Sequence, residues 1–297
     1  CADGFIPTKN ADGTYGVKEG KYVAKVGSKN YETLADAIRL AAKGKTVTLL
    51  CDVTIEGSQL IIEKGKTLTL DLAGKTLKIS KYTTEKAQVL VKGDLTLTDS
   101  VGGGKICSDY TGTSGRVVSV EENGKLTVEG GTITTEGMAN NGSAVYAGGS
   151  SVVTINGGTI YADAKSSNFA LNIKSASASV KMTGGTVKAD GVGTTAVNVA
   201  SSSPVSISGG TISGETAFFA RTAKTEITGG TFSGSVTAKK GSITGGTFTD
   251  DVSAYVPETA GCVQDENGNY TVVESMYLAK IGTTKYETLA AAVAAAK

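Results

Sequence analysis

Apolar and polar residues alternate in short runs along most of the chain, and glycine-rich or polar corners separate the runs. Alternation with a period of two is typical of β-strands, because successive strand side chains point to opposite faces. The runs form sets of three that recur in the same order. Two successive sets are 144–147, 152–155 and 159–161, then 170–173, 180–183 and 186–188. The pattern predicts an all-β chain built from repeating sets of three strands.

A Gly-Gly-Thr motif precedes the third run of each set. Its first glycine is Gly130, Gly157, Gly184, Gly209, Gly229 and Gly245, so the spacing falls from 27 residues to 16. A looser copy lies at 103–106, and 68–77 has a related pattern one repeat earlier. Repeats of this size with apolar alternation indicate a solenoid.

Alignment of the repeats produces columns of apolar residues that face one side of each strand. The second-strand column is Leu97, Val128, Ile155, Met182, Ile207, Ile227 and Ile243, and the third-strand column is Ile106, Ile133, Ile160, Val187, Ile212, Phe232 and Phe248. We expect a right-handed, three-faced parallel β-helix of about nine turns, roughly 40 Å long at ~4.8 Å per turn. A β-sandwich would need antiparallel hairpins, and the unchanged order of the runs favours parallel stacking.

A second repeat has a much longer period. Residues 22–43 read YVAKVGSKNYETLADAIRLAAK and residues 277–297 read YLAKIGTTKYETLAAAVAAAK, so that Tyr277 corresponds to Tyr22. The turn DGTY at 12–15 corresponds to NGNY at 267–270, at the same separation along the chain as Tyr22 and Tyr277. We call this separation the long-repeat offset. We therefore expect one full unit and the start of the next, with neighbouring repeats of the same chain as partners.

These repeats divide the chain into five segments. We expect a lead-in and linker at 1–32, a capping helix at 33–45, the β-helix at 46–249, a closing cap and linker at 250–275, and the start of the next repeat at 276–297. Thr33 with Asp36 resembles a capping box, and Gly44 is a C-terminal stop signal. The helix should lie over the first turn, because open strand edges of a solenoid invite aggregation.

Composition narrows the chemistry. The 297 residues include no His, which is the usual general base and the commonest metal ligand, so Ser-His and Cys-His nucleophile pairs and most zinc sites are excluded. A net charge of +1 gives no field that attracts nucleic acid or anionic lipid. No stretch has the length and apolarity of a membrane span, so we expect no membrane insertion. The four cysteines Cys1, Cys51, Cys107 and Cys262 have no metal-ligand spacing, allow three pairings, and are expected to be free or buried thiols.

Several segments together resemble tandem β-helix repeats in large surface proteins of Gram-positive gut bacteria. They are TVTLL and DVTI within 46–55, LTLDLAGKTL at 68–77, the serial GGTI and GGTF motifs, DVSAYVP ending at Pro257, and the AKxGxxxYETLAxA segment. The resemblance implies an extracellular, cell-surface or wall-attached location. The chain begins at Cys1 without a signal peptide, so we expect its leader and anchor to lie outside this stretch. It also implies a pectate-lyase-like superfold, whose members include lyases, glycoside hydrolases, adhesins and passenger domains, so the fold does not choose a function.

A polar column precedes the glycines, and it begins with three acidic residues. Its members are Asp71, Asp99, Glu129, Asn156, Thr183, Ser208, Thr228 and Thr244. The carboxylates are an alternative acid/base pair or Ca²⁺ site, because Ca²⁺ takes oxygen ligands. The column continues as Thr and Ser, which favours hydrogen bonding to corner backbone instead. We therefore assign no catalytic residue, no metal and no cofactor, with Ca²⁺ as the minor alternative.

The outward side of the first strands carries a second column, Leu90, Ser119, Tyr146, Asn172, Asn198, Phe219 and Thr237. Aromatic faces bind apolar patches, and amides form directional hydrogen bonds. Tyr146, Asn172, Asn198 and Phe219 are therefore ligand-binding candidates, joined by Tyr161 on the adjacent face. Stacked Asn and Thr ladders are also plain structural features of solenoid surfaces, and that interpretation stays open.

The sequence predicts a non-enzymatic repeat of a bacterial cell-surface protein, a stalk or adhesin that contacts host or microbial glycan or protein. Tandem duplication, a nearly neutral charge and the missing catalytic groups favour this function. The alternative is a polysaccharide lyase or glycoside hydrolase that acts through Asp71, Asp99 and Glu129.

Overall fold

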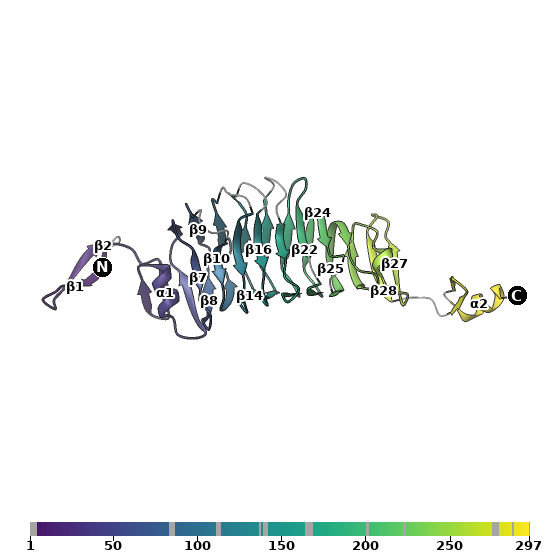
Figure 1. Ribbon diagram of the computed structural model, residues 1–297, viewed down its shortest axis with the longest axis horizontal. Coiled ribbons are helices and arrows are strands. Elements are labelled where there is room, and N and C mark those ends of the chain that lie inside the picture. Colours follow the sequence, from purple (N-terminus) through teal and green to yellow (C-terminus); the bar gives the residue numbers. More distant parts are fainter. Residues whose placement is uncertain are drawn as a thin grey trace.

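The computed structural model describes residues 5–82, 87–110, 114–136, 138, 142–163, 169–199, 202–221, 224–274, 279–286 and 288–296. Its strands stack into one elongated rod, with a small module at either end (Figure 1). The alternating sequence produces this shape because each short strand buries only one side and needs a neighbouring turn above and below to satisfy its backbone.

Three ladders of parallel strands form the faces of the rod. The first-face strands are β7 (Leu60–Ile62), β10 (Ala87–Val91), β13 (Arg116–Val120), β16 (Ser143–Ala147), β19 (Phe169–Ile173) and β22 (Thr195–Val199). The second-face strands are β5 (Lys45–Leu49), β8 (Thr67–Asp71), β11 (Asp94–Thr98), β14 (Lys125–Val128), β17 (Val152–Ile155), β20 (Ser179–Met182) and β23 (Pro204–Ile207). The third-face strands are β6 (Val53–Glu56), β9 (Thr76–Ser80), β12 (Lys105–Ser108), β15 (Thr132–Thr134), β18 (Thr159–Ala162) and β21 (Thr186–Ala189). The expected all-β, three-faced parallel β-helix is confirmed, and the β-sandwich is excluded.

Near the C-terminal end the turns shorten, and strands run through the corners from one face to the next. β24 (Thr211–Phe219) joins the third face to the first, β25 (Lys224–Thr237) passes over all three faces, and β26 (Ile243–Phe248) joins the second to the third. The falling spacing of the Gly-Gly-Thr motifs therefore reflects smaller corners between strands that keep their stacking order.

The predicted apolar columns are the core of the rod. Ile133 pairs with Ile160, which pairs with Val187, and all three side chains are fully buried. The second-face column is stacked and buried in the same way from Leu97 to Ile243. In the last turns the rings of Phe232 and Phe248 stack with their centroids 4.7 Å apart. Larger side chains thus fill the interior where the turns are shorter.

The Gly-Gly-Thr corner requires glycine because the backbone of the preceding turn lies directly against it. Gly158 has φ +65°, in the left-handed region that favours glycine, and a Cβ at this position would lie 2.7 Å from the carbonyl oxygen of Gly131. Gly131 itself belongs to the same corner one turn earlier. The motif therefore recurs because backbone packs directly on backbone at this corner.

The helix α1 (Leu34–Leu40) covers the N-terminal end of the rod. The Thr33 side chain accepts a hydrogen bond from the Asp36 backbone N–H, as the capping box predicts, and Leu34, Ala37 and Ile38 are buried. The helix is shorter than the expected 33–45. It ends at Leu40 because the Lys66 ammonium donates to the carbonyls of Arg39 and Ala41, and the next residues join the first turn.

Antiparallel strands complete both ends of the rod. β3 (Ala24–Val26) forms a hairpin with β4 (Lys29–Tyr31) and pairs antiparallel with β5. At the other end, after a 3-10 turn at Ser253–Tyr255, β27 (Ala260–Gln264) and β28 (Tyr270–Glu274) form a hairpin, and β28 pairs antiparallel with β26. Each terminal turn is thereby covered by a strand that is antiparallel to the strand of the rod it pairs with.

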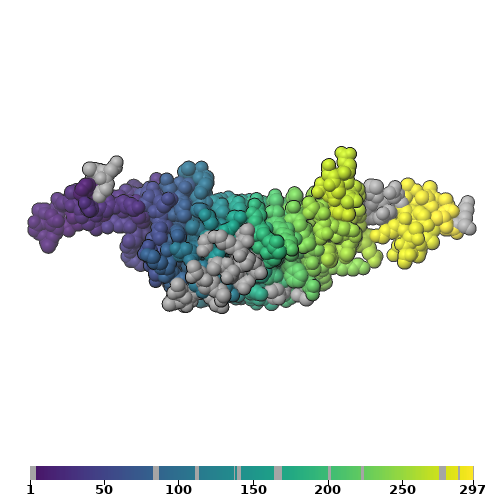
Figure 2. Space-filling model, turned by 90° about the horizontal axis from the view of Figure 1, so that it is seen from above, coloured from purple at the N-terminus to yellow at the C-terminus, as the bar shows by residue number. Residues whose placement is uncertain are grey.

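Beyond these caps lie two small modules. The hairpin β1 (Phe5–Lys9) and β2 (Tyr15–Glu19) precedes the N-terminal cap, and β29 (Ala279–Ile281), β30 (Thr284–Tyr286) and α2 (Leu289–Ala295) follow the C-terminal cap. They project from the two ends of the rod, the hairpin in purple and the helical module in yellow in Figure 2. The bounds of each element in these modules match those of an element in a cap of the rod, shifted by the long-repeat offset.

Within the part of the chain that the structure describes, neither α1 nor α2 has the length or apolarity needed to cross a bilayer. Cys51, Cys107 and Cys262 are free thiols, and Cys1 lies outside the described residues.

We predict that Gly158→Ala lowers the free energy of unfolding by more than the ~1–2 kcal/mol that a left-handed backbone conformation costs a residue with a Cβ. The added contact with the Gly131 carbonyl comes on top of that cost. Gly261→Ala is the matched control, because its Cβ would meet only the Val273 side chain at 3.6 Å. Urea denaturation followed by circular dichroism measures both variants. Equal stability of the two would contradict the backbone-packing explanation.

Candidate functional site

The acidic column differs from the one expected, because the register places Thr98, and not Asp99, beside Asp71. Leu97 pairs with Leu70 and with Val128, so the ladder position after these residues holds Asp71, Thr98 and Glu129. Asp99 lies one residue further, in the corner. The expected stack of three carboxylates is therefore wrong, since a Thr separates the two acidic side chains that do share the column.

Each of the three carboxylates accepts hydrogen bonds from its own turn or the neighbouring one. Asp71 is buried and accepts hydrogen bonds from the backbone N–H groups of Ala73 (3.0 Å) and Ser100 (2.9 Å) and from the Ser100 hydroxyl (2.8 Å). Asp99 accepts from the backbone N–H groups of Gly74 at 2.6 Å and Gly104 at 2.7 Å. These bonds satisfy corner donors that would otherwise lack a partner.

Glu129 is exposed, and its carboxylate accepts a 2.8 Å hydrogen bond from the Asn156 amide, whose oxygen in turn accepts from the Thr183 hydroxyl at 2.7 Å. The column thus continues as a ladder of side-chain hydrogen bonds from turn to turn. Among the described residues, no group of three Asp, Glu, Cys or His side chains is placed to hold a metal ion.

The first-face column has the register that the sequence predicts. Ser119 pairs with Tyr146, Tyr146 with Asn172, Asn172 with Asn198, and Asn198 with Phe219. Asn172 is only 5% exposed, and its amide donates to the Ser143 hydroxyl while its oxygen accepts from the Asn198 amide at 2.9 Å. Asn172 is therefore a structural link in the ladder, while Tyr146, Asn198 and Phe219 remain half-buried at its surface.

Two arginines lie against the aromatic residues of this column. The Arg116 guanidinium carbon is 3.4 Å from the centroid of the Tyr146 ring, and the Arg221 guanidinium carbon is 5.2 Å from that of Phe219. The Glu121 carboxylate holds Arg116 in place at 2.8 Å and also accepts from the Ser119 hydroxyl at 2.7 Å. We call Arg116, Tyr146, Asn198, Phe219 and Arg221 the first-face strip. It presents rings, an amide and cations on one face of the rod.

Tyr161 lies on the third face, where its register partners are Thr134 and Lys188. Its hydroxyl donates a 3.0 Å hydrogen bond to the Asp190 carboxylate, which also forms a 2.7 Å ion pair with Lys188. Burial, together with the bond to Asp190, raises the pKa of the Tyr161 hydroxyl to about 12. Tyr161 therefore belongs to a separate cluster on another face, and the structure does not bring it together with the first-face strip.

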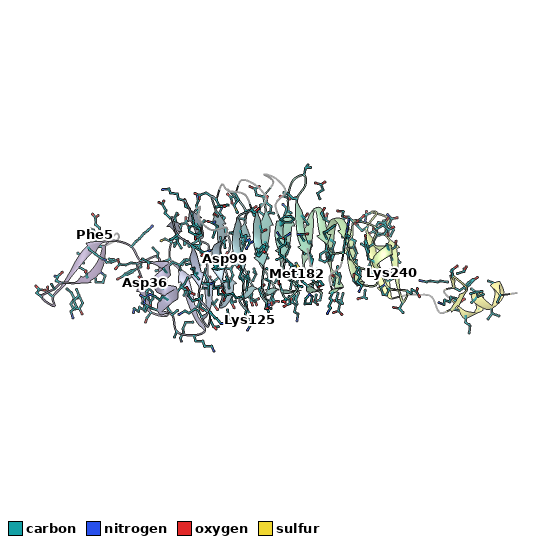
Figure 3. All side chains as sticks on the ribbon, viewed as in Figure 1. Phe5, Asp36, Asp99, Lys125, Met182 and Lys240 are labelled. Carbon is teal, nitrogen blue, oxygen red and sulfur yellow. The ribbon has the colours of Figure 1, made fainter. Side chains whose placement is uncertain are left out.

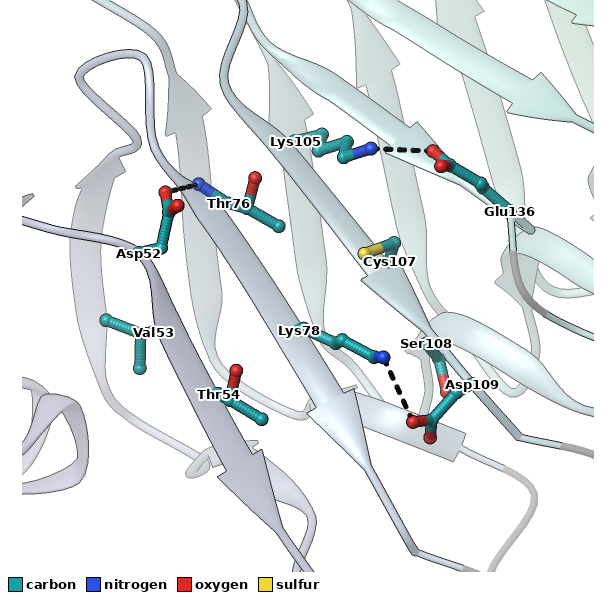
Figure 4. A pocket seen from close by; sticks show the side chains of 10 residues that line it. All are labelled: Asp52, Val53, Thr54, Thr76, Lys78, Lys105, Cys107, Ser108, Asp109 and Glu136. Atoms are coloured by element: carbon teal, nitrogen blue, oxygen red, sulfur yellow. Dashed lines mark hydrogen bonds and ion pairs between the residues drawn. The ribbon is translucent and has the colours of Figure 1, made fainter.

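A groove of about 410 Å³, which the sequence did not predict, lies on the N-terminal half of the third face (Figure 4). Cys107 lies on its floor beside its register partner Lys78, with Lys105 on the same strand. Lys78 forms an ion pair with Asp109 at 3.1 Å, and Lys105 with Glu136 at 2.7 Å. Lys78 and Lys105 lie at outward positions on successive third-face strands. Each is followed, at the corner of the next turn, by the acidic residue that it pairs with, Asp109 or Glu136. This repeated Lys-then-acid pattern is the sequence signal that would have found the groove.

Both lysines of this groove are paired with carboxylates within it. The hydrogen bond that Lys105 donates to Glu136 raises the pKa of the Lys105 ammonium, so that this cation persists well into alkaline solution. Burial raises the pKa of the Cys107 thiol, and the thiol therefore stays protonated at neutral pH. A protonated thiol is neither the nucleophile nor the metal ligand that cysteine chemistry needs. The groove is thus a polar depression whose side chains bind one another.

No protein-family model, curated protein or solved structure matches this chain. The parallel pairing of the strands establishes the β-solenoid.

We predict that Asp99→Ala lowers the free energy of unfolding by about 1–3 kcal/mol, because two corner N–H groups lose their acceptor. Glu129→Ala is the matched control in the neighbouring corner and should change stability by less than about 0.5 kcal/mol, since its side chain is exposed and bonds only another side chain. Urea denaturation of both variants decides the matter. A larger effect for Glu129→Ala would argue against a structural role for the Asp99 carboxylate.

We predict that Tyr161 titrates near pH 12, which phenolate absorbance difference spectra between the wild type and Tyr161→Phe will show. The folded-state pKa lies above the unfolded value of about 10, so its contribution to stability is complete below about pH 10 and is lost as the pH rises through about 12. Asp190→Asn should lower the pKa toward the ordinary value. An unchanged titration in Asp190→Asn would show that this hydrogen bond does not matter.

Proposed function

We propose that this chain is a non-enzymatic repeat of a bacterial cell-surface protein, which extends a glycan-binding face from the surface as a stalk or adhesin. The observation that carries the proposal is the recurrence of whole structural elements at the long-repeat offset. A unit that starts again with the same hairpin and helix is suited to serial extension, in which each rod adds length and repeats the same faces.

The first-face strip is the surface that we propose for recognition. Tyr146 and Phe219 offer aromatic surface, and Asn198 offers an amide between them in the same ladder. Arg116 and Arg221, which lie against these rings, add planar guanidinium donors. Rings combined with directional donors are the groups that bind the apolar face and the hydroxyls of a sugar.

The enzymatic alternative has less support. Asp71 is buried, and both Asp71 and Asp99 accept hydrogen bonds from corner N–H groups that would be left without an acceptor if these carboxylates turned toward a substrate. Glu129 is exposed but shares its column with Thr98 and Asn156. These contacts favour a structural role for the acidic residues.

The adhesive role is tested on arrays of host and microbial glycans, with an array of host surface proteins as the second arm. We expect a carbohydrate ligand whose affinity falls at least about tenfold, or ~1.4 kcal/mol, in Asn198→Ala and in Phe219→Ala. Thr154→Ala, on the outward side of the second face, is the control and should bind as the wild type does.

Blank arrays at high protein concentration would remove the adhesive part of the proposal. Binding on the protein array alone would replace the glycan with a protein partner. Turnover of an acidic polysaccharide that Asp99→Ala abolishes would overturn the non-enzymatic assignment. The surface location is checked separately, by antibody labelling of intact cells of the source organism.

A further inference from the structure

The N-terminal hairpin is a copy of the hairpin that closes the rod. β1 pairs with β2 from Phe5 opposite Glu19 to Lys9 opposite Tyr15. β27 pairs with β28 from Ala260 opposite Glu274 to Gln264 opposite Tyr270, which is the same register at the long-repeat offset. The two hairpins therefore have the same backbone pairing, although their environments differ.

The closing hairpin has a partner that the N-terminal hairpin lacks. β28 pairs with the last strand of the rod, Tyr270 opposite Phe248 and Thr271 opposite Thr247, and Val272 is 6% exposed. In the described residues, β1 and β2 form a two-stranded sheet of their own, and Val17, the counterpart of Val272, is 60% exposed. The N-terminal hairpin thus has an open strand edge and an uncovered apolar side.

The C-terminal module is likewise a copy of the N-terminal cap that lacks the partner strand of that cap. β3 pairs with β5 on the first turn of the rod, and its hairpin partner β4 lies on the other side. β29 and β30 form the same hairpin as a separate two-stranded sheet within the described chain. The edge of β29 that corresponds to the β5-binding edge of β3 is therefore open.

The helices differ in exposure but not in form. Thr288 caps α2 through the backbone N–H of Ala291, as Thr33 caps α1 through that of Asp36. Leu34 is 2% exposed on the rod, whereas its counterpart Leu289 is 66% exposed. Ile38 is buried, and its counterpart Val293 is 53% exposed. The C-terminal module is preformed, with an apolar face of the same chemistry and nothing described that covers it.

We propose that both free modules bind a second copy of this chain, end to end, in place of the corresponding cap of that copy. The edge of β2 pairs with β26 of a preceding copy, and the β29 edge together with the apolar face of α2 covers β5 of a following copy. The receiving surfaces are known because this chain already contains both complexes, with β28 on β26 and with β3 and α1 on β5. Side chains at the two ends stand clear of the rod, among them Phe5 (Figure 3). The inference rests on the proposed role as a serial repeat and names the contact between repeats.

Within one chain the tethered caps hold the receiving surfaces, because a short linker gives them an effective concentration in the millimolar range. The wild-type chain is therefore a monomer in solution. A copy whose own α1 is displaced must accept α2 from another copy. Since the donor and acceptor surfaces differ, this contact is head-to-tail and builds dimers and longer chains.

The test uses the full-length chain with Leu34→Asp and Ile38→Asp, which place charges on the buried face of α1. We expect its mass in light scattering to shift from one copy to two or more as its concentration rises, while the wild type stays monomeric. Adding Leu289→Asp and Val293→Asp on α2 is the matched control, and this quadruple variant should return to one copy. Circular dichroism checks that the rod remains folded. If the aspartates unfold it, Leu34→Ala with Ile38→Ala replaces them in the same comparison.

A folded double variant that stays monomeric, or association that persists in the quadruple variant, overturns the inference. Neither result depends on glycan binding, because Leu34 and Ile38 lie in the N-terminal cap and Leu289 and Val293 in the C-terminal module, whereas the first-face strip lies on the first face of the rod. Glycan binding without association would leave the proposed function standing and remove the end-to-end contact. Association without glycan binding would leave the end-to-end contact standing and remove the proposed glycan-binding function.

Discussion

The parallel register between successive turns is the constraint on which the rest of this protein depends. Each turn pairs with the next at the same backbone positions on all three faces, so that inward residues lie over inward residues. The interior then consists of columns, such as Ile133, Ile160 and Val187, whose side chains exclude water along the whole rod. Because apolar burial and strand pairing come from the same stacking, neither forms without the other.

The same register determines what the corners and surfaces hold. Where one corner rests on the previous one, as Gly158 does on Gly131, the backbone leaves no room for a side chain. Where a corner leaves N–H groups without a partner, an acidic side chain accepts them, as Asp99 does for Gly74 and Gly104. An acidic residue that the sequence offers as a catalytic candidate thereby stabilises a corner of the rod. The outward column of the first face is freer, and it keeps two aromatic residues with an arginine over each ring.

A stack of this kind has no natural end, because every turn exposes a strand edge that the next turn would cover. The chain solves this with antiparallel strands at both ends, β3 on β5 and β28 on β26. The terminal modules repeat these solutions without a rod beneath them, and their apolar residues are exposed as a result. Under the end-to-end arrangement, one stretch of chain would close one rod and open the next. A protein built this way would gain length without open edges between its units.

The sequence by itself determined the strand order, the core columns, the capping box at Thr33 and the long repeat, because alternation and spacing follow directly from local backbone geometry. It did not place Asp99 outside the acidic column, since a single-residue shift at a corner is visible only when the pairing is known. Nor did it show that Asn172 is a buried link, or that Cys107 lies between Lys78 and Lys105 in a groove. The same sequence pattern gives a buried Leu34 and an exposed Leu289, and only the tertiary structure decides between them. Burial depends on which surface lies opposite, and a local pattern carries no information about that surface.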